Sequence, residues 1–196
     1  MKLVVVTGNK RSLQEEAGDV IKLLNNGLDV YHLRKYEAKK DELKSFLSVI
    51  PEKFHNKIVL HSHFELLEEF DLKGIHLNEN NRKRGSEIRN LKKIISTSFH
   101  DLDELIACKE KYEYVFFSPV HESISKLGYQ PKYSQKEIAN AVTKTQQNVI
   151  ALGGISEKNI SEISKMGFMG AALSGAVWNG VDPVKAFLKI KNKISF

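Results

Sequence analysis

Residues 149–156 read Val149-Ile150-Ala151-Leu152-Gly153-Gly154-Ile155-Ser156, and this stretch decides the fold. Its first half is a short apolar run without polar alternation. Such a run is typical of a strand that is buried on both faces, as in a parallel sheet. The two glycines predict a tight turn, and the serine is a predicted helix N-cap. The stretch therefore predicts a buried parallel strand, a turn and a helix start.

Similar apolar runs recur on both sides of this stretch. They number eight in all, at residues 3–6, 28–33, 58–60, 74–77, 93–99, 114–120, 149–152 and 170–173. Segments with helical spacing lie between most of them, such as the apolar face of Leu43, Phe46, Leu47 and Ile50, which Pro51 ends. This alternation predicts an α/β fold, a (βα)8 TIM barrel. An open doubly wound sheet would show the same alternation, but eight strands without a dinucleotide-binding glycine fingerprint favour the barrel.

The chain length limits the size of this barrel. The 196 residues fit one domain with one core, so we predict a single TIM-barrel domain over residues 1–196. Barrels of this kind usually have about 250 residues. The loops must therefore be short and some helices degenerate. We expect the weakest strand–helix unit between Leu77 and Ile94, where residues 78–85 are polar.

The composition limits the location and the partners. No apolar run approaches the roughly 18 residues of a membrane span, and the N-terminal run lacks the basic head and cleavage site of a signal peptide. Cys108 is the only cysteine, which excludes an internal disulfide. The net charge of +6 suits an anionic small molecule. The basic clusters lack the interleaved aromatic residues of single-strand binders. We predict a cytoplasmic protein that binds neither membranes nor nucleic acids.

The residues just after each strand of a barrel form one face, and the chemistry of barrel enzymes lies there. In this chain these positions are rich in donors and cations and poor in carboxylates: residues 7–10, 34–35, 61–63, 76–78, 98–100, 118–119, 153–154 and 174–175. Barrel phosphate sites commonly follow the last two strands. We therefore predict that Gly153, Gly154, Ser174 and Gly175 bind a phosphate. The alternative is that the glycines only make tight turns.

Two more strand ends carry groups that suit anions. Arg34 follows the second strand, and a guanidinium there suits bidentate anion recognition. The alternative is a salt bridge at the barrel rim. Ser123, Ser125 and Lys126 follow the sixth strand. Two hydroxyls and an ammonium in one loop can hold a pyrophosphate or a carboxylate, and the alternative is a solvated surface loop.

The histidines have several possible roles. His61 and His63 suggest a metal pair, but no third ligand is evident, so we predict that no metal is bound by protein side chains there. His76 is expected to be a hydrogen-bonded interior histidine. His121 lies close to the 123–126 loop and is a candidate general acid or base near neutral pH. The alternative for His121 is an exposed loop residue.

Six motifs, taken in chain order, resemble those of the thiamin phosphate synthase/TenI family. They are His32-Leu33-Arg34, Gly74-Ile75-His76-Leu77, Ser98-Phe99-His100, residues 114–126, residues 151–155 and residues 170–176. The resemblance runs from near the N-terminus to about Trp178. It implies a barrel enzyme of thiamin biosynthesis. This transferase joins a pyrimidine, carried as its pyrophosphate, to a thiazole phosphate and releases pyrophosphate with the help of Mg²⁺.

The resemblance also assigns roles to residues of this chain. It implies that Gly153, Gly154, Ser174 and Gly175 bind the thiazole phosphate, and that the pyrophosphate contacts are Arg34, Ser98, Ser123, Ser125 and Lys126. We take Arg34, Lys126 and His121 as candidate catalytic residues. His61 and His76 are candidate substrate-binding residues.

The chain departs from the family pattern at the metal site. The synthases carry Asn-Asp where this chain has His61-Ser62, and an acidic residue where it has Asn80-Asn81, with Glu79 as a substitute. The expected Mg²⁺ ion therefore lacks its usual carboxylate ligands. We expect other cations to neutralise the leaving group instead, namely Lys35, or Arg82, Lys83 and Arg84.

Two other functions stay open. TenI-type thiazole tautomerases also lack the metal site, but their catalytic histidine falls near Pro119, so His121 would have to replace it. The other alternative is a non-catalytic carrier or regulator that binds thiazole phosphate or thiamin phosphate. In each case the expected partners are phosphorylated small molecules. A homodimer is also expected, since barrels of this kind often pair.

Overall fold

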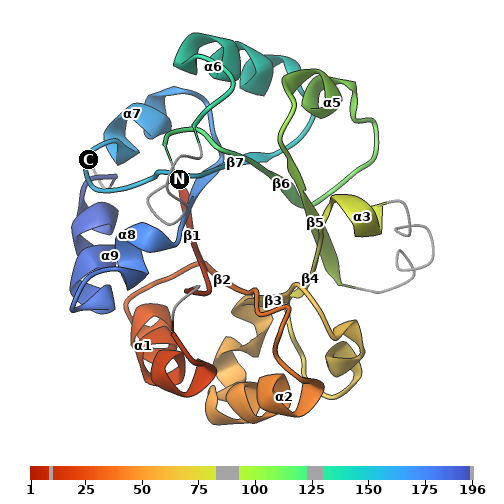
Figure 1. The fold of residues 1–196 in the computed structure, drawn as a ribbon, viewed down its shortest axis with the longest axis vertical. Helices are drawn as coiled ribbons and strands as arrows, with labels where there is room; N and C mark the ends of the chain where they lie inside the picture. Colours follow the sequence, from red (N-terminus) through yellow and green to blue (C-terminus); the bar gives the residue numbers. More distant parts are fainter. Residues whose placement is uncertain (9–10, 83–92, 123–129, 195–196) are drawn as a thin grey trace.

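The computed structural model describes residues 1–8, 11–82, 93–122 and 130–194. In this part of the chain the strands follow one another in order around a closed parallel barrel, and β8 pairs with β1 (Figure 1). The strands are β1 (Lys2–Val6), β2 (Val30–Leu33), β3 (Ile58–Leu60), β4 (Gly74–Leu77), β5 (Ile94–Phe99), β6 (Tyr114–Phe117), β7 (Val149–Leu152) and β8 (Gly170–Leu173). The predicted (βα)8 barrel is confirmed.

Helices surround the strands on the outside of the barrel (Figure 1). They are α1 (Leu13–Asn25), α2 (Lys40–Val49), α3 (Glu79–Arg82), α5 (Leu102–Ala107), α6 (Gln135–Lys144), α7 (Ile160–Lys165), α8 (Gly175–Trp178) and α9 (Pro183–Asn192), with the 3-10 turns η1 (Glu52–Lys57) and η2 (Phe64–Glu68) on either side of β3. Between β3 and β4 the 3-10 turn η2 takes the place of a longer helix. The connection from β4 to β5 begins with the short helix α3, and the rest of it lies outside the described residues. A degenerate unit is thus found between β3 and β4, whereas most of the stretch from Leu77 to Ile94, where we expect the weakest unit, lies outside the described residues.

Polar side chains cap the N-termini of α1, α5, α6 and α9. The Asp101 carboxylate caps α5, and the Asp182 carboxylate caps α9 ahead of Pro183. The prediction for Ser156 is wrong: α7 begins at Ile160, and its N-cap is Asn159. The Asn159 Oδ1 accepts a hydrogen bond from the Ser156 N–H at 2.9 Å, which stabilises a turn before the helix starts.

The strand side chains alternate between two apolar layers. The larger layer lies between the strands and the helices, and the smaller one fills the barrel interior with Val4, Val6, Val30, Val59, Tyr114, Phe116, Ile150 and Ala172. Every residue of β2, β4, β6 and β8 is therefore buried. Two interior positions hold imidazoles instead, His32 on β2 and His76 on β4. No helix in the described part of the chain has the length and apolarity needed to cross a bilayer.

Candidate functional site

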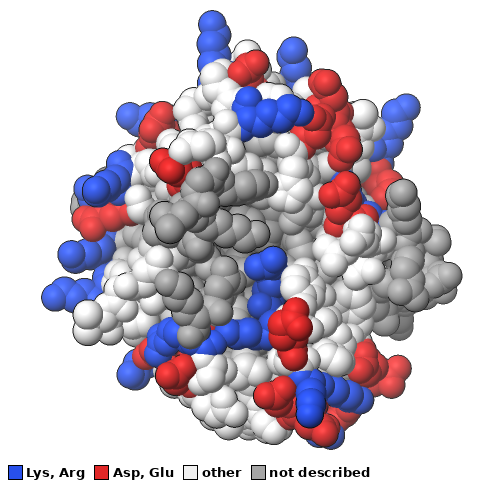
Figure 2. Space-filling model, in the orientation of Figure 1, with Lys and Arg blue, Asp and Glu red and all other residues white. Residues whose placement is uncertain are grey.

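A cavity of about 320 Å³ opens where the strands end. Side chains and backbone from the ends of β2 to β8 line it, including Arg34, Tyr36, His61, His76, Glu79, Ser98, His100, Ser118, Gly153, Gly154, Ser174 and Gly175. In Figure 2, basic and acidic side chains gather around the circumference of the barrel, and basic ones also lie toward its middle. The cavity therefore brings together seven of the eight strand ends that the sequence singles out; of the described residues after β1, neither Thr7 nor Gly8 lines it.

The two glycines after β7 are required by the backbone itself. Gly153 has φ +94° and Gly154 has φ +67°, in the left-handed region that favours glycine. A Cβ on Gly154 would lie 2.3 Å from the Glu122 carbonyl oxygen, and a Cβ on Gly153 would lie 2.8 Å from the Pro119 Cα. The turn and the close approach of residues 119–122 thus explain both glycines. Phosphate binding at this turn stays a prediction.

Arg34 reaches the cavity from the end of β2. Its backbone N–H donates a 2.9 Å hydrogen bond to Thr7 Oγ1, and its guanidinium lies 5.2 Å from the centre of the Tyr36 ring. None of the ion pairs among the described residues includes Arg34. The salt bridge offered as its alternative role is therefore not found in this part of the chain. The guanidinium lines the cavity next to the imidazoles.

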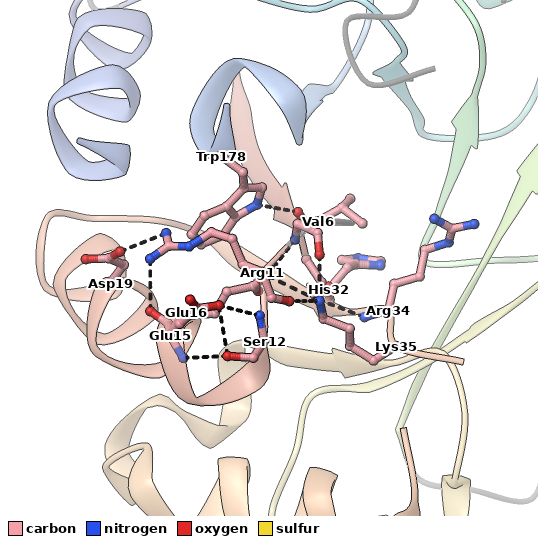
Figure 3. Close-up of polar contacts among 12 residues, drawn as sticks. Val6, Arg11, Ser12, Glu15, Glu16, Asp19, His32, Arg34, Lys35 and Trp178 are labelled. Atoms are coloured by element: carbon pink, nitrogen blue, oxygen red, sulfur yellow. Dashed lines mark hydrogen bonds and ion pairs between the residues drawn. The ribbon is translucent and has the colours of Figure 1, made fainter. Parts of the chain in front are cut away.

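Lys35 points the other way, toward α1 (Figure 3). Its Nζ donates to the Gly8 carbonyl oxygen at 2.6 Å and to the Arg11 carbonyl oxygen, and lies 3.5 Å from Glu16 Oε1. These contacts tie the loop after β1 to α1 and β2, and Lys35 does not line the cavity. The expectation that Lys35 neutralises a leaving group is therefore not supported.

Glu16 is the buried centre of this arrangement. Its carboxylate accepts hydrogen bonds from Tyr31 OH at 2.8 Å and from the Gly8 N–H at 3.0 Å. Burial raises the pKa of Glu16, while the Tyr31 hydrogen bond and Lys35 act in the opposite direction. On the same side the Trp178 Nε1–H donates to the Val6 carbonyl oxygen at 2.7 Å, so α8 is fixed to β1 (Figure 3). These contacts hold the loop after β1 against α1, and they hold α8 against β1.

Arg82 also lies outside the cavity lining. Its guanidinium is 3.5 Å from Glu104 and 4.3 Å from the centre of the Phe99 ring. Lys83 and Arg84 lie outside the described residues, as do Ser123, Ser125 and Lys126. Among the described candidates for binding a pyrophosphate, the structure thus places Arg34 and Ser98 in the cavity.

Three imidazoles lie together beside the cavity: two of them, His61 and His76, line it, and His32 packs against both. We call His32, His61 and His76 the histidine cluster. His32 Nδ1 and His61 Nε2 are hydrogen-bonded at 2.9 Å, and the His61 and His76 rings stack with centres 4.3 Å apart. All three side chains are almost completely buried. Burial lowers the pKa of each, and the positive charge of Arg34 lowers the pKa of His61 and His76 further.

The outer ring nitrogens of the histidine cluster contact hydroxyl groups. His32 Nε2 is 2.6 Å from Tyr114 OH, and His76 lies between two serines, 2.9 Å from Ser96 Oγ and 2.8 Å from Ser98 Oγ. The interpretation of His76 as a hydrogen-bonded interior histidine is confirmed. Its pKa falls to about 3, first because of burial and then because of Arg34. The imidazoles of the histidine cluster are therefore uncharged at neutral pH.

Three other histidines near the strand ends lie in different surroundings. His121 does not line the cavity; its Cβ lies against Gly154, and its Nε2 is buried without a partner among the described residues. His63 turns away from His61 and donates to the Ala38 carbonyl oxygen at 3.1 Å. His100, which sequence reasoning did not select, does line the cavity, and its Nδ1–H donates to the Ser118 carbonyl oxygen at 2.8 Å. Its place in the Ser-x-His motif at a strand end was the available signal.

A closed barrel with this cavity at its strand ends defines the class of the protein: a (βα)8 barrel whose site lies where barrel enzymes hold their chemistry. The sequence profile of the family described as "Thiamine monophosphate synthase" matches residues 3–177. The chain belongs to that family, and the resemblance that its motifs suggest is confirmed. Its membership of this family makes it an enzyme of thiamin biosynthesis.

Relatives span nearly the whole chain. A thiamine-phosphate synthase of Caldicellulosiruptor bescii is 26% identical over 170 residues, which cover 83% of this chain and 77% of the relative. The crystal structure of a thiamine phosphate pyrophosphorylase from Bacteroides thetaiotaomicron is 37% identical and has a TM-score of 0.80, with 98% of this chain and 97% of that chain covered. A thiamine phosphate pyrophosphorylase from Pyrococcus furiosus has a TM-score of 0.82 at 22% identity, over 98% and 94% of the two chains. The last likeness shows the fold alone.

Proposed function

We propose that the chain is a thiamine phosphate synthase, which joins a pyrimidine, supplied as its pyrophosphate, to a thiazole phosphate and releases pyrophosphate. The observation that carries this proposal is the single cavity that Arg34 shares with the glycine turns after β7 and β8. Such a cavity can hold two phosphorylated molecules side by side. The family to which the chain belongs supports the same reaction.

The thiazole phosphate would bind at Gly153, Gly154, Ser174 and Gly175. The two turns face the same cavity, and α8 begins at Gly175 directly after β8. Glycine backbone lets N–H groups approach phosphate oxygens closely. The Ser174 side chain makes no capping hydrogen bond to α8, so its hydroxyl is available to a phosphate.

The pyrophosphate would bind at Arg34 and Ser98, with Ser123, Ser125 and Lys126 as the loop residues that the family resemblance assigns. The bond between the pyrimidine methylene carbon and the pyrophosphate oxygen breaks, and its electron pair leaves with the pyrophosphate. The thiazole nitrogen then forms the new bond to the carbocation. Arg34 would neutralise the charge that grows on the leaving oxygen.

Mg²⁺ is the cofactor that the family implies. The residues present fit it with fewer carboxylate ligands than the family resemblance implies. Mg²⁺ needs oxygen ligands, and proteins hold it with one or two carboxylates when substrate phosphates supply other ligands. Glu79 is the carboxylate among the described residues that line the cavity, next to Asn78. We propose that Glu79 would hold the ion. When bound, Mg²⁺ would supply further neutralisation of the pyrophosphate charge.

An assay with both substrates, with and without Mg²⁺, tests this function. We expect equal amounts of thiamin phosphate and pyrophosphate, with a rate that rises with Mg²⁺. The absence of product from folded protein, combined with tautomerisation of a thiazole phosphate, would overturn the synthase proposal in favour of the tautomerase. Binding of thiazole phosphate without either reaction would indicate a carrier or regulator instead.

The remaining expectations also stand as proposals. We propose phosphorylated small molecules as the partners, a cytoplasmic location, and a homodimer. Light scattering on the eluting protein measures its molar mass in solution, and a mass of one chain would contradict the dimer.

A further inference from the structure

The histidine cluster has the composition of a metal-binding site. One ring nitrogen from each of His32, His61 and His76 can be chosen so that the three atoms all lie within 4.8 Å of one another. The residues come from the ends of three neighbouring strands, β2, β3 and β4, which pair in parallel. Three imidazole nitrogens with one open position are the ligand set of several catalytic zinc sites. Imidazole also suits zinc, whereas Mg²⁺ prefers oxygen ligands.

Hydroxyl groups hold the outer nitrogens in place. His32 Nδ1 and His61 Nε2 face each other, while His32 Nε2 contacts Tyr114 OH at 2.6 Å and His61 Nδ1 lies 3.4 Å from Tyr36 OH. Metal-binding histidines almost always donate their second ring N–H to a neighbouring acceptor, which fixes the tautomer and the orientation of the ring. Both ring nitrogens of His76 contact serine hydroxyls, Nδ1 with Ser96 and Nε2 with Ser98, so the nitrogen that binds the metal would exchange its serine for the ion while the other serine holds the ring.

The protons can be accounted for without a charged imidazole. The hydrogen bond between His32 Nδ1 and His61 Nε2 requires a proton on one of these two atoms. A neutral imidazole carries one N–H, so that ring can move its proton to its outer nitrogen and donate it to Tyr114 OH or Tyr36 OH. Both inner nitrogens then present lone pairs. Metal binding thus needs a change of tautomer in one of these two rings and the release of one serine contact at His76.

The distances require a small adjustment. A tetrahedral zinc ion with Zn–N bonds of about 2.0–2.1 Å holds two nitrogens about 3.4 Å apart. The His32 and His61 nitrogens, now 2.9 Å apart, would move slightly apart. The His76 nitrogen, now within 4.8 Å of the other ligand atoms, would move closer to them. His61 and His76 line the cavity, so the open position would face it. Arg34 lines the same cavity, and its charge favours an anion as the fourth ligand.

We propose that His32, His61 and His76 bind one divalent first-row transition metal ion, with zinc as the main candidate. This site is separate from the Mg²⁺ that Glu79 would hold. The sequence-based prediction of no metal relied on the missing third ligand for His61 and His63. His32 and His76 supply it here, and His63 takes no part.

Metal content of the full chain, produced without a histidine tag, tests the proposal. The protein is incubated with Zn²⁺, dialysed against buffer with excess Mg²⁺, and analysed by elemental mass spectrometry. We expect about one zinc per chain in the wild type and in the control His63→Gln, which alters a histidine outside the cluster. His61→Gln and His76→Gln should bind zinc at least about 100-fold more weakly, and Tyr114→Phe about 10-fold more weakly.

Co²⁺ provides a second measurement on the unmodified protein. Four-coordinate Co²⁺ bound through nitrogen absorbs visible light strongly, and Zn²⁺ should abolish the absorption by displacement. Circular dichroism shows whether each variant is folded, and Tyr114→Phe keeps the test valid if the histidine variants unfold. A wild-type protein that retains no zinc and gives no Co²⁺ spectrum overturns the proposal, as does equal zinc affinity in folded His61→Gln. These readouts need no substrate, so they do not depend on the proposed synthase reaction.

Discussion

The two sides of the cavity are built in different ways. After β7 and β8 the site consists of backbone: Gly153 and Gly154 have positive φ, and α8 begins at Gly175. After β2, β3 and β4 it consists of side chains, among them those of Arg34, His61 and His76. The glycine side carries the motifs on which the family resemblance rests, whereas the histidine side lacks the carboxylates that the resemblance implies. The proposed thiazole phosphate site therefore relies on backbone N–H groups, and the proposed pyrophosphate site relies on side-chain charge.

Arg34→Met should have the largest effect and separates the two sides most directly. We expect kcat to fall about 10²- to 10³-fold, because the substitution removes the preorganised positive charge that would stabilise the leaving pyrophosphate. The KM for thiazole phosphate should change little, since we propose that this substrate binds on the glycine side. Steady-state kinetics with each substrate varied in turn measures both. Arg82→Met is the matched control, because Arg82 does not line the cavity. An equal loss in both variants would contradict the role of Arg34.

Gly154→Ala should act on the glycine side and weaken the binding of thiazole phosphate. The new Cβ would lie 2.3 Å from the Glu122 carbonyl oxygen at a φ of +67°, so the turn must shift. We expect the affinity for thiazole phosphate to fall about 100-fold, with a loss of stability of about 1–3 kcal/mol. Calorimetric titration and denaturant unfolding measure the two effects. Gly18→Ala is the control, because nothing lies within 4 Å of its added Cβ. Unchanged affinity in Gly154→Ala would remove the phosphate from this turn.

Glu79→Gln tests the reduced metal site. Since Glu79 is the carboxylate that lines the described cavity, its loss should raise the Mg²⁺ concentration needed for half-maximal rate by about 10-fold. The maximal rate should recover at high Mg²⁺. Glu162→Gln on α7 serves as the control variant. A Mg²⁺ dependence identical to that of the wild type would exclude Glu79 as the ligand.

Glu16→Gln should have the smallest effect. It should change how the free energy of unfolding depends on pH. Burial raises the folded-state pKa of Glu16 above its ordinary value of 4.5, so the folded protein binds this proton more readily than the unfolded chain. The stability contributed by the protonated carboxyl is present below pH 4.5 and is lost as pH rises through the folded-state pKa. The free energy of unfolding of Glu16→Gln should therefore improve relative to the wild type as pH rises from 4 to 7. A constant difference would show that Glu16 does not titrate differently on folding.

Much of the barrel and its glycine side was predictable from the sequence. The strands are contiguous apolar runs, and a Gly-Gly pair after such a run points to a turn because no other residue accepts positive φ so readily. The start of α7 was misplaced because Asn159, rather than Ser156, is the N-cap. A local pattern cannot decide between two capping residues so close together.

The histidine cluster could not be predicted, because its members are 29 and 15 positions apart along the chain. Only the strand register brings them together: His32 pairs with Val59 across β2 and β3, and His76 with Ser96 across β4 and β5. The buried Glu16 had a signal in the sequence. It lies on the apolar face of α1, beside Leu13, Ala17 and Val20, where an acidic residue needs a partner.

A crystal structure with thiazole phosphate and pyrophosphate bound together tests the central claim most directly. The account predicts two occupied sites in the one cavity: the thiazole phosphate against the backbone of Gly153, Gly154 and Gly175, and the pyrophosphate in contact with the Arg34 guanidinium. A thiazole phosphate at Arg34, or a pyrophosphate that occupies the glycine turns in its place, would contradict the division of the cavity into a backbone side and a side-chain side.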